Sequence, residues 1–310
     1  MASAVLDECG ISRASGSIES HIGQTPLIRL GKVTTDLPEA VEIFAKAEHL
    51  NPGGSIKDRA ALSMILEGER SGKLRPGMTI VDATSGNTGI AYAMIGASRG
   101  YPVTVCLPEN ASSQRKTILR GYGVEIVETD QMLSTDGAQL IARQLFEQDP
   151  EKYFYPDQYN NDANWLAHYE GTANEIWEQT SGQVTHFITG LGTSGTFVGV
   201  VRRLRQLNPT LKAFAVQPSS PLHGLEGLKH MATARLPGIF DPTLADGTLE
   251  VQTEDALLMT RRLAREEGLF VGPSSGANVF AVRELAKSLT EPAQIVTILC
   301  DGGERYLNEQ

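Results

Sequence analysis

Short apolar runs alternate along the chain with stretches whose apolar residues have helical spacing, and glycine-rich turns separate the two. Runs at 78–84, 102–108 and 123–129 have the length of buried strands, and each precedes a helical pattern. Strands that alternate with helices predict parallel sheets with crossover helices. The pattern therefore predicts an α/β fold with parallel-rich, twisted sheets flanked by helices.

The alternation continues through the rest of the chain. A long helix is predicted to end near Thr180, after an aromatic and polar stretch. A chain of 310 residues exceeds what one core usually holds, so we expect two lobes. The other predicted segments are strands at 41–50, 185–190, 211–217, 269–273 and 293–301, and helices at 57–72, 90–100, 112–123 and 136–149.

Composition excludes several classes of function. Hydrophobic residues make up 41% and charged residues 21%, which is typical of a soluble globular protein. The net charge is −10 and the basic residues are scattered, which argues against a nucleic-acid partner. No apolar stretch approaches the ~20 residues that span a bilayer. The first twenty residues resemble a mobile polar tail rather than a secretory signal, and three sparse cysteines, Cys9 among them, indicate a reducing cytoplasm.

Lys57 stands in the first turn of a predicted helix, directly after the turn-forming run at 51–55. The helix macrodipole is positive there, so this position disfavours a lysine. An isolated lysine at a helix start is most simply a solvated side chain. The sharper hypothesis is a lysine kept neutral, because the positive helix end and partial burial both lower its pKa. A neutral amine is a nucleophile toward an aldehyde.

A second turn, at 83–91, joins a strand to a helix and is rich in hydroxyl and amide side chains. Free backbone N–H groups and hydroxyls at a helix start could hold a small anion such as a carboxylate. Alternatively, Ser85 or Asn87 simply caps the helix. Both interpretations remain open on this stretch alone. Its polar residues are Thr84, Ser85, Asn87 and Thr88.

A third turn, at 189–200, contains the spacing G-x-G-x-x-G after a predicted strand. A dinucleotide site of this kind also requires an acidic residue at the end of the next strand, where this chain has Gln217. A single phosphate therefore fits better than a dinucleotide. The expected phosphate-binding residues are Gly192, Thr193, Ser194, Gly195 and Thr196.

A fourth turn, at 270–280, carries Ser274 and Ser275, either of which could be only a helix cap. Together the four turns supply a lysine nucleophile, a carboxylate cradle, a phosphate cradle and a lone hydroxyl. This set suits a cofactor with an aldehyde and one phosphate, and an amino acid as substrate. The chemistry points to pyridoxal 5′-phosphate.

The motifs at these turns, with several others in the same order and spacing, carry a resemblance over residues 18–307. The chain resembles the fold-type II pyridoxal-phosphate enzymes of the cysteine synthase and cystathionine β-synthase family. Within it, the O-acetylserine sulfhydrylases, particularly their B form, are the most similar. The motifs are IGQTPLIRL, NPGGSIKDR, ATSGNTGIA, PDQYNN, HYEGT, THFITGLGTSGT, LPGIF, GPSSGA and CDGGERYL.

The resemblance implies a two-lobed fold like that of the tryptophan synthase β chain. A large domain, 1–46 together with 152–310, would bind the cofactor phosphate. A smaller mobile domain, 47–151, would carry the substrate-carboxylate loop.

The resemblance also implies residue roles. Lys57 would form the Schiff base and shuttle the Cα proton, Asn87 would bond the ring oxygen, and Ser274 would face the ring nitrogen. A neutral serine makes a weaker electron sink than an aspartate, which suits elimination of a good β-leaving group. The substrate carboxylate would be held by Thr84, Ser85, Asn87, Thr88 and Gln158, and the phosphate by Gly192, Thr193, Ser194, Gly195 and Thr196.

The implied reaction is a β-replacement through an α-aminoacrylate. It would make L-cysteine from O-acetyl-L-serine, or O-phospho-L-serine, and sulfide or a related donor. A haem-free cystathionine β-synthase that condenses serine with homocysteine is the alternative, and hydrogen sulfide release from cysteine is a side reaction of either. Serine racemase and threonine dehydratase relatives favour an all-glycine phosphate loop. An idle binding or scaffold relative would be expected to have lost Lys57 or the SGNTG loop.

Some positions depart from the family pattern or extend it. The phosphate loop usually reads G-T-G-G-T or G-T-T-G-T, whereas this chain has Ser194 at the third position. Lys229, in a basic segment with His223 and His230, could attract an anionic leaving group or sulfur donor, although a solvated loop is the simpler interpretation. No histidine has metal-ligand spacing, so no metal site is expected. The family implies a homodimer, and docking to serine acetyltransferase stays open.

Overall fold

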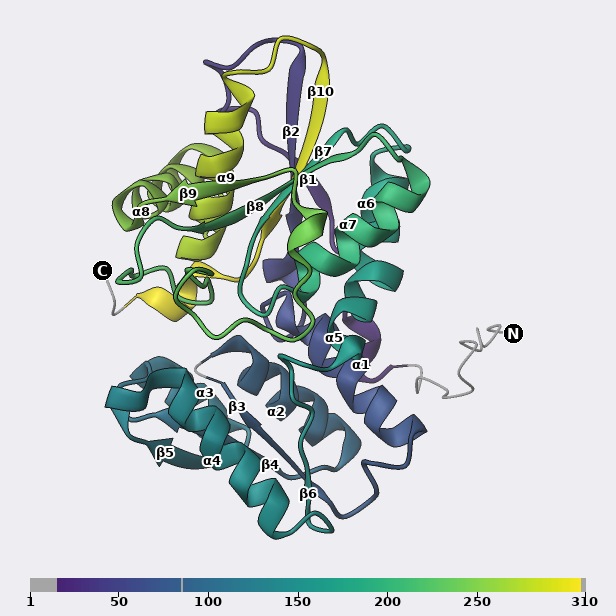
Figure 1. Cartoon of the computed structure of the whole chain (residues 1–310), viewed down its shortest axis with the longest axis vertical. Coiled ribbons are helices and arrows are strands. Elements are labelled where there is room, and N and C mark those ends of the chain that lie inside the picture. The colour runs from purple at the N-terminus through teal and green to yellow at the C-terminus, as the bar shows by residue number, and fades with distance from the viewer. Residues whose placement is uncertain (1–15, 85, 308–310) are drawn as a thin grey trace. The chain divides into compact units, whose positions relative to one another are not determined.

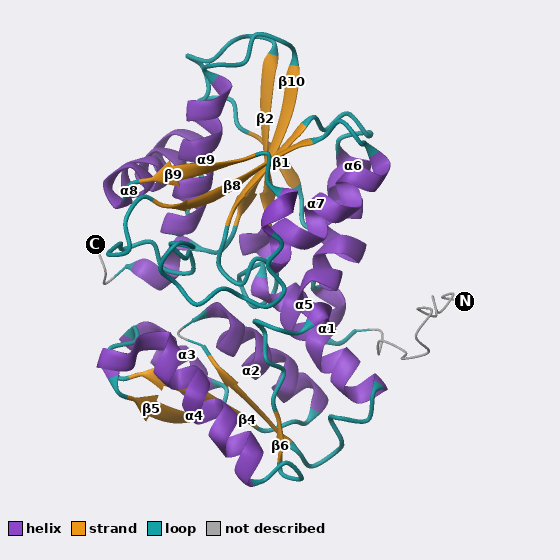
Figure 2. Cartoon of the chain, in the orientation of Figure 1, coloured by secondary structure: helices purple, strands orange, loops and turns teal. Residues whose placement is uncertain are grey.

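The structure, a computed structural model, describes residues 16–84 and 86–307, which excludes Cys9 and most of the polar tail. Its contacts divide the chain into two compact units. Unit 1 comprises Met1–Ile22 and Lys57–Ala163, and unit 2 comprises Gly23–Ile56 and Asn164–Gln310. Each unit has a sheet and helices of its own (Figures 1 and 2). The predicted α/β fold class is confirmed.

Unit 2 is built on a six-stranded sheet with the order β1-β2-β10-β7-β8-β9. Only β1 runs antiparallel, pairing with β2, and the other four pairs are parallel. The carboxyl ends of the parallel strands therefore meet at one edge, where ligands bind in such sheets. The strands are β1 (Leu27–Arg29), β2 (Val41–Ala47), β7 (His186–Gly190), β8 (Lys212–Pro218), β9 (Gly247–Val251) and β10 (Ala293–Leu299).

Helices cover both faces of this sheet, and each face has its own core. Ile295 packs in the cluster that contains α8 and α9, whereas its neighbour Val296 packs in the cluster that contains α6 and α7. Successive side chains of a strand point to opposite faces, so buried strands read as continuous apolar runs. The unit's helices are α6 (Ala173–Gln179), α7 (Gly195–Leu207), α8 (Thr253–Arg262) and α9 (Pro273–Ala286), with short turns η2 (Glu48–Leu50), η4 (His168–Thr172), η5 (Pro242–Leu244), η6 (Leu263–Glu267) and η7 (Gly303–Tyr306).

Unit 1 has a four-stranded parallel sheet with the order β5-β4-β3-β6. Ile80 belongs to the core shared with α1 and α2, and Val81 to the core shared with α4. The same alternation of faces therefore buries β3 on both sides. The elements are η1 (Ile18–His21), α1 (Lys57–Arg70), β3 (Thr79–Ala83), α2 (Asn87–Arg99), β4 (Val103–Pro108), α3 (Ser113–Gly121), β5 (Glu125–Thr129), η3 (Gln131–Leu133), α4 (Ser134–Gln148) and β6 (Tyr153–Phe154); α5 (Asp162–Ala167) contains the boundary between the units.

Several predicted elements are wrong. The apolar run 269–273 is not a strand, because only Val271 forms a bridge there, with Gly302. Strands β1, β6 and β9 were not predicted: β1 and β9 are short and half-exposed, and β6 is buried but only two residues long, so none forms an apolar run. The long helix expected to end near Thr180 is interrupted by a π-helical turn, η4, between α5 and α6.

The boundaries of the two units differ from those expected of the two domains, in which the smaller domain was residues 47–151. Residues 47–56 join unit 2, since Ser55 bridges Asp301 and Ile56 N–H donates to Cys300 O, and the N-terminal stretch up to Ile22 joins unit 1. Residues 152–163 join unit 1, since β6 pairs with β3. No helix among the described residues is long and apolar enough to cross a membrane.

Candidate functional site

The lysine singled out in the sequence is the first residue of α1. Lys57 is half-buried, and Asp58 and Arg59 beside it are buried. The turn before it includes Gly54 with a φ of 77°, a left-handed conformation that favours glycine. The structure thus places a lysine amine at a helix N-terminus, immediately after a turn that the glycine makes possible.

The proposed carboxylate loop in unit 1 joins β3 to α2. Thr88 Oγ1 donates to Gln158 Oε1 at 2.9 Å, and Gln158 Nε2 donates to Ala83 O at 3.1 Å. Gly86 N–H donates to Thr84 Oγ1 at 3.1 Å. Gln158, 70 residues further along the chain than Thr88, is therefore brought onto both ends of the loop.

The start of α2 has no side-chain cap. Asn87 is its first residue and half-buried, and the N-cap residue Gly86 has no side chain to cap the helix. The first N–H groups of a helix have no acceptor within the helix, so they can bind an anion. Ser85, the remaining predicted member of the loop, lies outside the described residues.

A buried acid precedes this loop on β3. Asp82 is 2% exposed, and its carboxylate accepts hydrogen bonds from Ala83 N–H at 2.7 Å and Tyr92 O–H at 2.9 Å. Burial raises the pKa of Asp82 to about 7, against the lowering effect of these hydrogen bonds. The sequence pattern carries no signal for this residue, because an acid inside an apolar run looks like an interruption of the strand.

The proposed phosphate loop lies in unit 2, between β7 and α7. Ser194 is the N-cap of α7 in the left-handed region, with a φ of 68°. Its Oγ donates to Thr193 O at 2.6 Å and makes no capping bond to the helix. A glycine would be favoured in this conformation, so the serine holds a strained backbone at the position where the chain departs from the family pattern.

The glycines of the phosphate loop allow close approach of other segments. A Cβ on Gly192 would lie 2.2 Å from Gly227 O, and a Cβ on Gly195 would lie 2.1 Å from Asn164 Oδ1. Both glycines are therefore required by packing. The backbone N–H groups at the start of α7 are left as anion donors.

Two residues that contact threonines of the phosphate loop were not assigned to the site from the sequence. Asn164 Nδ2 donates to Thr193 Oγ1 at 3.2 Å, and His168 Nε2 lies 3.3 Å from Thr196 Oγ1. His168 Nδ1 also lies 3.0 Å from Thr172 Oγ1, and the residue is 1% exposed. Both belong to the α5–η4 segment, and their four-residue spacing on a helix was the available signal.

The basic segment around Lys229 packs against the phosphate loop. Lys229 N–H donates to Leu191 O at 2.8 Å, and Leu228 lies over Gly190, where a Cβ would meet it at 2.3 Å. The Lys229 residue is half-buried. Burial first, and His230 second, lower the pKa of His223 below 6.5, so His223 adds little positive charge at neutral pH.

Ser274 lies in the first turn of α9, directly after Pro273, and is 5% exposed. The neighbouring hydroxyl, Ser275 Oγ, accepts the Cys300 N–H at 2.8 Å, so Ser275 ties α9 to the end of β10. Of the two serines considered in the sequence, Ser275 has this structural role.

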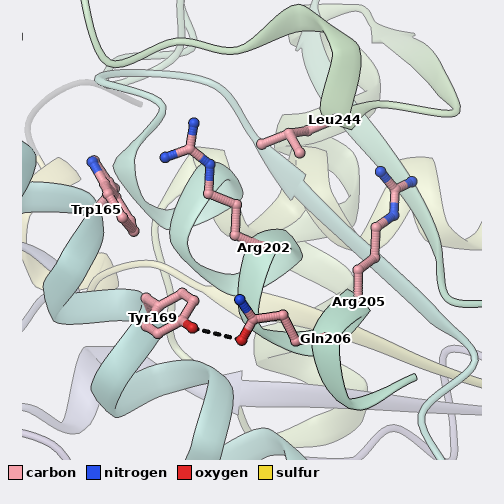
Figure 3. Close-up of a pocket in the computed structure, with 6 residues that line it drawn as sticks. All are labelled: Trp165, Tyr169, Arg202, Arg205, Gln206 and Leu244. Carbon is pink, nitrogen blue, oxygen red and sulfur yellow. Dashed lines mark hydrogen bonds between the residues drawn. The ribbon is translucent and has the colours of Figure 1, made fainter. Parts of the chain in front are cut away.

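A surface hollow on the outer side of α7 contains none of the predicted site residues (Figure 3). The Arg202 guanidinium lies over the Trp165 ring, 4.6 Å from its centroid, and pairs with Asp241 at 3.4 Å. Arg205 pairs with Asp246 at 2.7 Å. Each of the two arginines thus has an acidic partner, which balances its positive charge. Its lining residues are Trp165, Tyr169, Arg202, Arg205, Gln206 and Leu244.

Comparison with known proteins identifies the family of the chain. The sequence model of the pyridoxal-phosphate dependent enzymes matches residues 18–301. The chain therefore belongs to this family, and the resemblance seen in the sequence motifs is confirmed.

Within the family, the similar proteins are cysteine synthases and their neighbours. A cysteine synthase of Aquifex aeolicus is 50% identical over 299 residues, which cover 95% of this chain and 91% of that protein. Cysteine synthase B of Escherichia coli is 40% identical over 292 residues, covering 94% of each. The crystal structure of an O-acetylserine dependent cystathionine beta-synthase from Helicobacter pylori has a TM-score of 0.90 at 32% identity, covering 96% of this chain and 99% of that one.

Proposed function

We propose that the chain is a pyridoxal-phosphate dependent cysteine synthase that forms L-cysteine from an activated serine, O-acetyl-L-serine first, and sulfide or a related donor. The observation that carries the proposal is the phosphate loop: an uncapped helix start at α7, flanked by glycines that admit no side chain. Its identity to cysteine synthases over nearly the whole chain supports the choice of reaction.

The residues present fit the cofactor. Hydroxyls of Thr193 and Thr196 and the N–H groups at the start of α7 are donors for a phosphate, and Asn164 and His168 orient the two threonines. Ser274 supplies a buried neutral hydroxyl for the ring nitrogen, and Asn87, at the start of α2, an amide for the ring oxygen.

Lys57 is the proposed catalytic residue. When bound, pyridoxal phosphate draws electrons from the Cα–H bond of the attached amino acid. Lys57 Nζ would hold the cofactor at its aldehyde carbon, and, once displaced by the substrate amine, the free Lys57 amine would accept the Cα proton and later return it. Thr84, Thr88 and Gln158 hold the substrate carboxylate, with Ser85 and Asn87 as further proposed donors. In the balanced reaction the Cβ–O bond breaks, acetate leaves, and a Cβ–S bond forms.

The visible spectrum tests this function. We expect a yellow protein whose spectrum changes when O-acetyl-L-serine is added and returns when sulfide is added, with cysteine and acetate as products. Lys57→Ala should abolish the change, and Lys73→Ala, an exposed lysine of the same unit, should preserve it. A protein that stays colourless with added pyridoxal phosphate would overturn the proposal.

A second candidate, cystathionine β-synthase activity, is favoured by the Helicobacter pylori neighbour, which is described as O-acetylserine dependent. A competition experiment separates the two activities: sulfide and homocysteine are offered together to the enzyme loaded with O-acetylserine, and the ratio of cysteine to cystathionine is measured. Lys229 is tested separately, by comparing how wild type and Lys229→Ala use O-acetylserine against O-phosphoserine as first substrate and sulfide against thiosulfate as donor. If Lys229→Ala leaves the relative use of these compounds unchanged, Lys229 has no part in their selection.

We further propose a cytoplasmic homodimer without nucleic-acid or membrane partners. The family resemblance supports the dimer, and the sparse cysteines and scattered basic residues support the rest. Docking to serine acetyltransferase is a separate question, which co-elution of the two proteins answers.

A further inference from the structure

The turn at 51–56 that leads into Lys57 is held at its start by a buried carboxylate. Glu48, 0% exposed, accepts hydrogen bonds from Thr25 Oγ1 at 2.7 Å and from Asn51 Nδ2 at 2.8 Å. Asn51 Oδ1 in turn accepts the Gly23 N–H at 2.9 Å. The first residue of the turn is therefore fixed by a network that lies wholly in unit 2.

The rest of the turn is held by the C-terminal segment 300–306. The Arg305 guanidinium donates to Gly53 O and lies against Gly54, where a Cβ would come within 2.4 Å of Nη2. Arg305 is 5% exposed. Further along, Gly302 N–H donates to Gly54 O at 3.3 Å, and Ile56 N–H donates to Cys300 O at 2.9 Å. The residue just before Lys57 is thus hydrogen-bonded to this segment.

The same C-terminal segment holds the approach to Ser274. Gly272 N–H donates to Asp301 O at 3.0 Å, and Val271 bridges Gly302. Tyr306 O–H donates to Asp301 Oδ2 at 2.6 Å, which fixes the carboxylate against Gly272. The segment 300–306 therefore holds the backbone just before Lys57 and the backbone just before Ser274, the two proposed cofactor-contacting residues.

We propose that Arg305 is a positioning residue that fixes the Gly53–Gly54 turn and, through it, the amine of Lys57. Arginine suits this place, because its planar, permanently charged guanidinium can bond a turn carbonyl and lie beside a glycine that has no side chain. Catalysis depends on the position of the reacting amine, and a misplacement of about 1 Å can cost roughly a hundredfold in rate. The catalytic consequence rests on the proposed function, whereas the brace itself does not.

The test compares Arg305→Met, which keeps the stem and removes the guanidinium, with Arg305→Lys and a matched control. The control is Arg283→Met, another buried arginine of unit 2, 6% exposed, which pairs with Asp36 at 2.8 Å. Amide hydrogen exchange is measured without cofactor on peptides covering 51–57. We expect exchange there to be about tenfold faster in Arg305→Met, intermediate in Arg305→Lys and unchanged in Arg283→Met.

A second measurement follows Lys57 directly. Each protein is loaded with pyridoxal phosphate and reduced with borohydride, and the fraction of Lys57 carrying the cofactor is determined by mass spectrometry. We expect a smaller labelled fraction of Lys57 in Arg305→Met, and kcat for O-acetyl-L-serine lowered about tenfold or more with KM nearly unchanged, because the carboxylate loop is intact.

The outcomes separate the brace from the function. Unchanged exchange at 51–57 in Arg305→Met overturns the proposal, as does an equal effect of Arg283→Met. If Arg305→Met does not fold, Arg305→Lys decides by the same exchange measurement: faster exchange supports the brace and wild-type exchange overturns it. If the wild-type protein takes up no cofactor, the proposed function is wrong. The exchange measurement then still decides whether Arg305 fixes the turn at 51–57.

Discussion

Asp82 shows how one buried side chain can set the pH dependence of stability. It lies near the end of an apolar strand, and its hydrogen bonds only partly offset the loss of water. Burial raises its pKa to about 7, whereas an aspartate in an unfolded chain has a pKa near 4. Between these values the folded protein binds the proton more tightly. The unfolding free energy contributed by this group therefore falls as pH rises from about 4 to about 7.

The substitution Asp82→Asn should remove this loss of stability. The new amide would keep an acceptor for Ala83 N–H and could donate to the Tyr92 hydroxyl oxygen without carrying charge. From pH 5 to pH 8 the unfolding free energy of the variant relative to wild type should rise by about 3 kcal/mol, since the wild type loses its bound proton over roughly two pH units. Denaturant unfolding of both apoproteins at the two pH values measures the difference. A difference independent of pH would contradict the assignment.

At the scale of elements, the phosphate loop depends on how closely α7 approaches the α5–η4 segment. A Cβ on Gly199 would lie 2.1 Å from Trp165 O and 2.8 Å from Tyr169 N. Backbone atoms cannot move aside as a flexible side chain can, so the helix must shift. A shift of α7 would also separate Thr196 from His168, which lie 3.3 Å apart. The glycine therefore links helix packing to the proposed phosphate site.

Gly199→Ala should lower the unfolding free energy by about 1–3 kcal/mol through overpacking and should weaken binding of pyridoxal phosphate. The control is Gly121→Ala at the end of α3, where a Cβ would meet nothing within 4 Å. That variant should be neutral or more stable by up to about 1 kcal/mol, since alanine favours helix. Denaturant unfolding and cofactor titration measure both effects. Equal behaviour of the two variants would contradict the role of the close approach.

The predicted strands show the limit of reading elements from sequence. Those at 78–84, 102–108 and 293–301 correspond to β3, β4 and β10, because strands buried on both faces are continuous apolar runs. The run 269–273 also begins with apolar residues but is not a strand. Its backbone bonds the C-terminal segment at Gly272 instead, a pairing that no apolar run signals.

For the whole molecule, cofactor binding should appear as added stability. Pyridoxal phosphate at about 100 times its Kd should raise the unfolding free energy by about 2.7 kcal/mol, because it binds only the folded chain. Pyridoxal, which lacks the phosphate, should stabilise far less at the same concentration, since it leaves the start of α7 unused. Thermal unfolding with each compound tests this. Equal stabilisation by both would mean that the phosphate loop is not the binding determinant.

Sequence patterns alone were enough to predict the fold class, the family and the four turns. Periodicity and turn chemistry are local, and a lysine or glycine at a helix start is visible without the fold. Tertiary structure was needed to find which distant residues support those turns: Gln158 on the carboxylate loop, His168 below the phosphate loop, and Arg305 beside Gly53. Those contacts join segments up to 252 residues apart, and no local pattern encodes the closure of such a loop.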